Sequence, residues 1–194
     1  MNKFLAVALL SALATPAFAD SSNLSGLYAG ATLGTGSASF SAPVGSGLVV
    51  DNTKSRPVYG VFGGYRYTPN LAAELAYTGV SYIYTTAAGT RYLSKQIAFS
   101  LTAVGSYPIN DVFSIYGKLG VASSSSENDS VGEQNTRRFG PTFGAGAEYR
   151  ITPKIAARLG IDSYAVAATI PTVAPAVKQN STATVVNAGL SYSF

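Results

Sequence analysis

The sequence contains no cysteine, no histidine and no tryptophan among its 194 residues. Without cysteine the chain can form no disulfide and no thiolate metal site, and it has no thiol to carry a lipid anchor. Without histidine it has no imidazole to activate a serine or a water molecule as a general base. Asp and Glu could still act as bases, but no paired carboxylates fall together at one loop. We therefore expect no enzymatic activity, no metal site and no cofactor.

Charge is also scarce. Asp, Glu, Lys and Arg together make up 11% of the residues, whereas they make up about a quarter of an ordinary soluble domain. Apart from Arg137-Arg138, the basic residues are scattered singly along the chain. Because nucleic-acid-binding proteins gather such residues into a stripe or patch, we expect no nucleic-acid partner.

The longest apolar run lies within the first 19 residues. Lys3 precedes an apolar segment at residues 4–13, and Ala17-Phe18-Ala19 has the spacing of a cleavage site, which together are typical of a secretory signal peptide. The run is shorter than the roughly 20 residues that a membrane-spanning helix needs. We expect residues 1–19 to be a cleaved signal peptide and residues 20–194 to form one mature domain.

Glycine and tyrosine are abundant, with 20 and 13 residues, and they lie in segments where apolar residues alternate with small or polar ones. At the end of the chain, for example, Ala188, Leu190, Tyr192 and Phe194 occupy alternate positions. A period of two indicates a strand with one apolar face. Eight such strands are expected, at residues 24–40, 56–67, 71–84, 92–107, 112–123, 138–151, 155–166 and after about 181.

The connections between these segments are alternately long and short. Tight turns are expected at residues 68–70, 108–111 and 152–154, and long loops at residues 41–55, 85–91, 124–137 and about 167–181. Short turns at one end and long loops at the other are typical of a bacterial membrane barrel. A belt of aromatic residues is expected at the short-turn end, where such rings favour the membrane interface: Tyr65, Tyr67, Tyr107, Tyr149, Tyr192 and Phe194. The sequence thus predicts an all-β, eight-stranded antiparallel up-and-down transmembrane β-barrel.

A soluble barrel with an apolar interior, as in the lipocalins, is the alternative fold. Its outer faces would need many charges, whereas the expected strands carry only seven mid-strand charges, all with inward parity. Seven charges cannot solvate a whole exterior, but they can fill a narrow lumen. We therefore expect a charge network in the lumen, formed by Arg66, Glu74, Lys118, Glu148, Arg150, Arg158 and Asp162.

Five segments, taken in order, resemble the transmembrane domain of OmpA-type outer-membrane proteins. They are Leu27-Tyr28-Ala29-Gly30-Ala31-Thr32-Leu33-Gly34, Val61-Phe62-Gly63-Gly64-Tyr65, Ile115-Tyr116-Gly117-Lys118-Leu119-Gly120, residues 146–159 and Gly189-Leu190-Ser191-Tyr192-Ser193-Phe194. The resemblance covers nearly all of the expected mature chain except the loops. It implies a Gram-negative outer-membrane barrel with both mature termini in the periplasm. Longer family members carry a peptidoglycan-binding domain after the barrel. Because this sequence stops at Phe194, we expect no such activity.

The resemblance also implies a structural or surface role, in membrane integrity, adhesion or as a surface antigen, through four extracellular loops. Glu74, Lys118, Glu148 and Arg158 match charged residues in the lumen of the family, whereas Thr32 and Val104 stand where the family has lysines. Two interpretations of the lumen stay open. The charges form either a static polar plug or a narrow ion pore gated by a Glu74–Arg158 pair, and the missing lysine at Val104 removes the obvious alternative partner of Glu74.

Other expectations concern partners. Asn187, Gly189, Tyr192 and Phe194 resemble the C-terminal signal that the barrel-assembly machinery recognises. Cations near the loop ends could pair with lipopolysaccharide phosphates through charge-assisted hydrogen bonds, although simple surface solvation explains them equally well: Lys54, Arg56, Arg91, Lys95, Arg137, Arg138 and Lys178. We expect a monomer surrounded by outer-membrane lipids, with loops available to a host or surface ligand.

Overall fold

The computed structural model describes residues 26–38, 48–49, 56–86, 91–128, 136–170 and 177–194. The expected signal peptide and its cleavage site lie outside these residues. Among the described residues, no helix is long and apolar enough to cross a membrane. The elements are β1 (Gly26–Ala38), β2 (Leu48–Val49), β3 (Arg56–Thr68), β4 (Leu71–Thr86), β5 (Arg91–Pro108), β6 (Phe113–Asn128), β7 (Thr136–Arg150), β8 (Ile155–Ile170) and β9 (Val177–Ser193).

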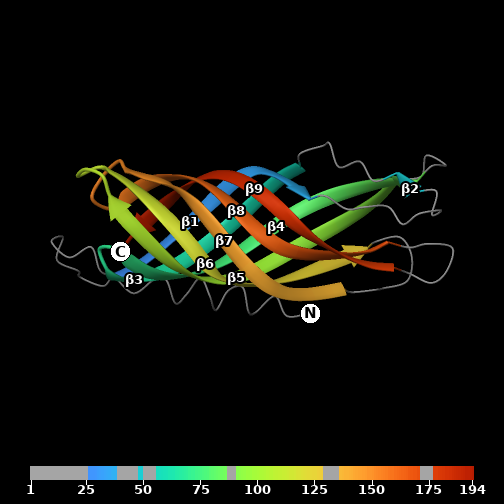
Figure 1. Cartoon of the computed structure of the whole chain (residues 1–194). Helices are drawn as coiled ribbons and strands as arrows, with labels where there is room; N and C mark the ends of the chain where they lie inside the picture. Colours follow the sequence, from blue (N-terminus) through green and yellow to red (C-terminus); the bar gives the residue numbers. More distant parts are fainter. Residues whose placement is uncertain (1–25, 39–47, 50–55, 87–90, 129–135, 171–176) are drawn as a thin grey trace, which may run out of the picture.

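The eight long strands form a closed antiparallel barrel (Figure 1). Each long strand pairs with the next in the sequence, and β1 pairs with β9 to close the ring. This confirms the predicted fold class. The short strand β2 pairs with the end of β4, through Leu48 with Thr86 and Val49 with Thr85. The sequence had placed β2 in a loop, and a two-residue strand is too short to give a periodic signal.

Side chains of alternate residues point into and out of the barrel, and the usual distribution of polarity is inverted. Large apolar side chains such as Leu33, Leu119 and Phe143 are exposed on the outside, while Glu74, Arg158 and Asp162 are buried. Burying apolar side chains is normally the main favourable term of folding in water. An exterior this apolar is instead suited to lipid, with polar residues facing the lumen.

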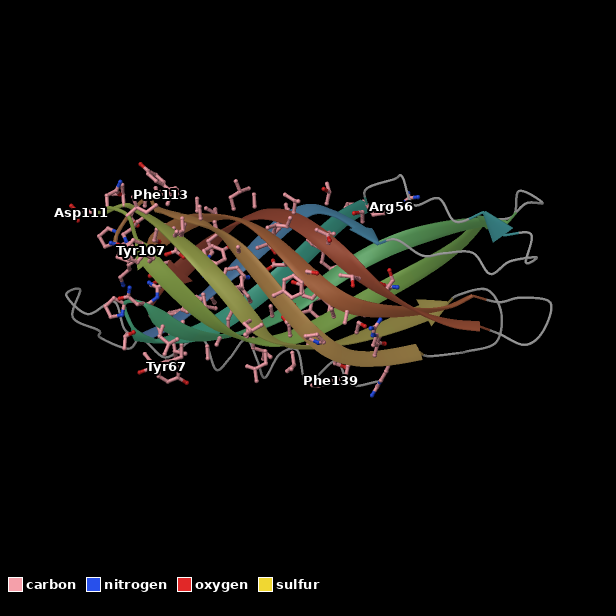
Figure 2. The ribbon with its side chains drawn as sticks, viewed as in Figure 1. Arg56, Tyr67, Tyr107, Asp111, Phe113 and Phe139 are labelled. Carbon is pink, nitrogen blue, oxygen red and sulfur yellow. The ribbon has the colours of Figure 1, made fainter. Side chains whose placement is uncertain are left out.

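The aromatic belt lies where the sequence predicted it. Figure 2 shows Tyr67 and Tyr107 at the end of the barrel that also holds Asp111 and Phe113, whereas Phe139 and Arg56 lie further toward the loop end. Tyr65, Tyr149 and Tyr192 are likewise exposed, and Phe194 is half-buried. The tyrosine rings can occupy the membrane interface on the side of the tight turns, because each combines an apolar body with a polar hydroxyl group.

Several strands are longer than the sequence predicted. β6 runs to Asn128 rather than residue 123, β8 runs to Ile170, and β9 begins at Val177. Ser124, Ser125 and Ser126 pair with β5 and β7 instead of forming a loop. The composition of this segment is typical of loops, but its backbone groups are satisfied by the ladder whatever side chains it carries.

Glycine makes room for aromatic rings in the narrow interior. A Cβ atom added to Gly64 would come within 2.5 Å of the Tyr28 ring, and one added to Gly146 would come within 2.5 Å of the Tyr116 hydroxyl. Neither contact is sterically allowed, so these two positions exclude larger residues. The rings of Tyr28 and Tyr116 can therefore lie across the lumen, beside the buried charges.

A charge on the outer wall tests whether this surface faces lipid. Leu119, a residue that is 68% exposed, projects from the outside of β6. Leu119→Arg is expected to lower the free energy of unfolding by about 2–4 kcal/mol if it lies near the bilayer midplane. The measurement is urea unfolding of the protein refolded into liposomes. Ile109→Arg, in an exposed tight turn, is the control and should cost at most about 1 kcal/mol. Equal effects would contradict the lipid-facing assignment.

Candidate functional site

Six charged side chains meet in the lumen and form one continuous chain of ion pairs. Charges of opposite sign alternate along it, so three cations balance three anions. Arg158 lies at its centre and binds two carboxylates. The successive N–O distances are 3.5 Å for Arg66–Glu148, 3.0 Å for Glu148–Arg158, 2.7 Å for Arg158–Glu74, 3.1 Å for Glu74–Lys118 and 3.5 Å for Lys118–Asp162.

The guanidinium of Arg158 is also enclosed by aromatic rings. Its Cζ lies 4.8 Å from the ring centre of Phe62, 5.0 Å from that of Tyr116 and 5.5 Å from that of Tyr28. Arginine suits this position, because its planar group pairs with carboxylates and stacks on rings. The rings and the carboxylates together restrict the guanidinium to one place.

The carboxylates have further partners. The Tyr28 hydroxyl donates to Glu74 Oε2 at 3.1 Å, and Asn187 Nδ2 donates to Asp162 Oδ2 at 2.7 Å. Glu74 thus receives hydrogen bonds from Arg158, Lys118 and Tyr28. An ionised carboxylate can be buried this deeply only when its oxygens are satisfied in this way.

Comparison with known proteins identifies the family. The sequence model of the outer membrane protein beta-barrel domain matches residues 5–194. The chain belongs to this family. It is 33% identical over 102 residues to outer membrane protein A of Escherichia coli O157:H7. The aligned region covers 52% of this chain and 30% of that protein.

Other comparisons agree with this assignment. The chain is 31% identical over 159 residues to outer membrane protein P5 of Haemophilus influenzae. The aligned region covers 70% of this chain and 43% of that protein. It therefore spans less than half the length of these two relatives. Its fold resembles the crystal structure of neisserial surface protein A, with a TM-score of 0.65 at 15% identity over 87% of this chain and 97% of the other. The resemblance to OmpA-type barrels is thus confirmed, and the protein is an outer-membrane β-barrel.

Of the seven charges that the sequence grouped in this outer-membrane barrel, Arg150 does not join the ion-pair chain. Its Nη1 donates to the backbone carbonyl of Asp111 at 3.0 Å, in the tight turn before β6. Arg150 has the same parity as Glu148, but it is the last residue of β7, beside the tight turn.

The missing lysine at Val104 does not leave Glu74 with a single partner. Val104 packs in an apolar cluster with Tyr28, Phe62, Ala72 and Tyr116, while Lys118 reaches Glu74 from β6. Lys118 therefore gives Glu74 a second cation besides Arg158, in place of the lysine that the family has at position 104. The contact between Lys118 and Glu74 could not be predicted from strand pairing, because β4 and β6 are not neighbouring strands.

The expected lipopolysaccharide contacts are described in part. Arg137 is exposed, Arg56 is partly buried, and Arg138 Nη1 donates to the backbone carbonyl of Ser181 at 3.1 Å. Lys54 lies outside the described residues, as do the side chains of Arg91, Lys95 and Lys178. In the described part of the chain, no group of three or more acidic, His or Cys side chains could hold a metal ion.

The residues of the expected assembly signal divide between the two faces of β9. Asn187 faces the lumen, where it binds Asp162, and Gly189 packs on Thr32 of β1. Tyr192 and Phe194 meet edge to face, with ring centres 5.2 Å apart. The amide of Phe194 donates to the carbonyl of Leu27 at 3.0 Å, which ties the end of the chain to β1.

Sequence reasoning missed three interior residues. Tyr28 and Tyr116 enclose Arg158, and Gln96 is buried with no protein partner for either atom of its amide. Tyrosines of inward parity that face glycines on the next strand were the available signal for the two rings. No signal in the sequence marks Gln96, because burial of a lone amide depends on three-dimensional packing.

Removal of the central arginine tests the ion-pair chain. Arg158→Ala leaves Glu74 and Glu148 with fewer counter-charges, and loss of one partner of a buried pair typically costs about 3–5 kcal/mol. Arg150→Ala is the matched control outside the chain and should cost under about 1 kcal/mol. Urea unfolding in liposomes measures both. Similar losses for the two variants would show that the chain of ion pairs does not stabilise the barrel.

Proposed function

We propose that this outer-membrane barrel is a plugged scaffold with a structural and surface role, in membrane integrity, adhesion or as a surface antigen. The observation that supports the proposal is the ion-pair chain, which joins β3, β4, β6, β7 and β8 across the lumen. Glu74, at its centre, is only 1% exposed. A lumen filled in this way favours rigidity over transport, and eight-stranded barrels of this type have interiors just wide enough for side chains.

The surface role would be carried by the long connections at one end of the barrel. We propose that these loops face the outside, that Arg56, Arg137 and the other loop-end cations pair with lipopolysaccharide phosphates, and that the barrel works as a monomer. We also propose export by a cleaved signal peptide of residues 1–19. The strand β9, with Tyr192 and Phe194, would be recognised by the assembly machinery.

Solute entry into vesicles tests the plug. Liposomes that contain the refolded wild-type protein are expected to swell in arabinose no faster than empty liposomes, because the interior is occupied by side chains. A large general porin in the same liposomes is the positive control. Rapid swelling with the wild-type protein would contradict a plugged lumen.

Loop exchange tests the surface role. Replacement of residues 39–55, 129–135 or 171–176 with short Gly/Ser linkers is expected to lower binding of whole cells to host cells or serum proteins. The ladder of the eight long strands should be unaffected, although replacement of residues 39–55 also removes the two pairs between β2 and β4. Heat-dependent gel mobility provides the folding control, because a folded barrel migrates as a compact species until boiled. Unchanged binding for all three variants would reject an adhesive role for the loops.

A narrow gated ion pore is the second candidate function. Its support is that Glu74 contacts both Arg158 and Lys118, while Arg158 contacts both Glu74 and Glu148. Each group of the Glu74–Arg158 pair could therefore release the other and keep a counter-charge. If this pair alone closes the pore, Glu74→Ala should open it in planar-bilayer recordings. Recordings identical to those of the wild type would reject that pair as the sole barrier.

A further inference from the structure

A second contact crosses the lumen between the same two strands as the Glu74–Arg158 pair. The hydroxyl groups of Thr78 on β4 and Tyr164 on β8 lie 3.4 Å apart. In the closed ring, β4 and β8 are four strands apart in both directions, so they face each other across the barrel. Thr78 and Tyr164 both lie closer to the loop end of their strands than Glu74 and Arg158. The lumen is thus bridged at two successive levels.

The side chains of the second level are buried and carry no charge, and this level adjoins the ion-pair chain, because Val185 pairs across strands with Asp162. Tyr164 is 7% exposed and Val185 is 1% exposed. A Cβ atom added to Gly36 would come within 2.9 Å of a Val58 methyl group and 3.2 Å of a Val185 methyl group. Valines from β3 and β9 therefore converge over a glycine of β1, on the part of the wall between the strands that carry Thr78 and Tyr164.

Tyr164 also lies where the hydrogen-bonded ladder between β7 and β8 ends. The ladder between β7 and β8 extends to Thr142–Tyr164, and no β7–β8 pair is found beyond it in the described residues. Pro141, which has no N–H group to donate, adjoins this last pair. The Ser124 hydroxyl donates to the Ala165 carbonyl at 3.1 Å, so β6 supplies a hydrogen bond where the β7–β8 ladder has ended. Tyr164 therefore lies at the last rung of the β7–β8 ladder, at the limit of this part of the wall.

We propose that Tyr164, Thr78, Val58 and Val185 form a second, uncharged closure of the lumen, in series with the ion-pair chain. The proposal rests on the plugged lumen put forward above and adds that release of the charged level does not open it. Ions that pass the charged level would still meet a tyrosine ring and valine methyl groups. In a lumen only just wide enough for side chains, these groups block ions by their volume. The charged level responds to neutralisation of its side chains, whereas the uncharged level does not.

Planar-bilayer recordings of single and double variants test the two levels. Glu74→Ala and Tyr164→Ala are each expected to conduct like the wild type, because one closure remains in each. The double variant is expected to carry at least about tenfold more current, since neither the Glu74 carboxylate nor the Tyr164 ring then fills the narrow lumen. Glu74→Ala combined with Tyr164→Phe is the matched control. It keeps the ring and removes only the hydroxyl group, and it should stay closed.

The possible results separate this proposal from the plugged scaffold itself. If Glu74→Ala alone conducts as well as the double variant, the second closure is rejected while the plugged wild type stands. If the wild type conducts freely, the plugged scaffold is rejected. Every variant must first show heat-dependent gel mobility as proof of folding. Should Tyr164→Ala fail to fold, Val185→Gly in the Glu74→Ala background replaces it, and a closed double variant would again overturn the proposal.

Discussion

The structure depends on the requirement that every backbone N–H and C=O group within lipid be hydrogen-bonded inside the protein. Strands meet this requirement only if the sheet has no free edge, and pairing of β1 with β9 removes the edge. Once the ring is closed, the two-residue period forces every second side chain inward. The apolar exterior and the charged interior are therefore two consequences of one constraint, since the outer faces meet lipid and the inner faces meet one another.

The narrow interior in turn dictates how the charges are arranged. Burial of an ion costs several kcal/mol unless a counter-charge and hydrogen bonds compensate for it. Six charges crowded into a narrow lumen can satisfy this only if opposite signs alternate, so that each has a counter-charge, which is the order observed from Arg66 to Asp162. Arg158 is the member on which the others depend most. It joins both halves of the chain and packs on three rings, an arrangement that the single ammonium group of a lysine could not reproduce.

Much of this could be predicted from the sequence, because a strict two-residue alternation fixes which face each residue occupies. Together with the alternation of short turns and long loops, it predicts the eight strands and the aromatic belt, and it places Glu74, Glu148, Arg158 and Asp162 on the inner face, where they are buried. The height of each residue along the barrel axis cannot be predicted in this way, since it depends on the stagger between tilted strands. For that reason the sequence analysis grouped Arg150 with the six charges of the ion-pair chain, from which it is separated. It also gave no sign that Lys118 reaches Glu74. The serines of β6 were misassigned because the backbone ladder does not depend on their side chains.

The two levels of the lumen differ in what could open them. In the charged level, a move of Arg158 away from Glu74 leaves Glu74 with Lys118 and Arg158 with Glu148, so no charge is left without a partner. That makes a rearrangement of ion pairs energetically accessible, although the rings around Arg158 oppose it. The uncharged level offers no such exchange of partners, because its closure comes from the volume of Tyr164, Val58 and Val185. If the lumen is closed in both ways, as we propose, the charges can rearrange without making the barrel permeable, which is the property that the proposed scaffold role requires.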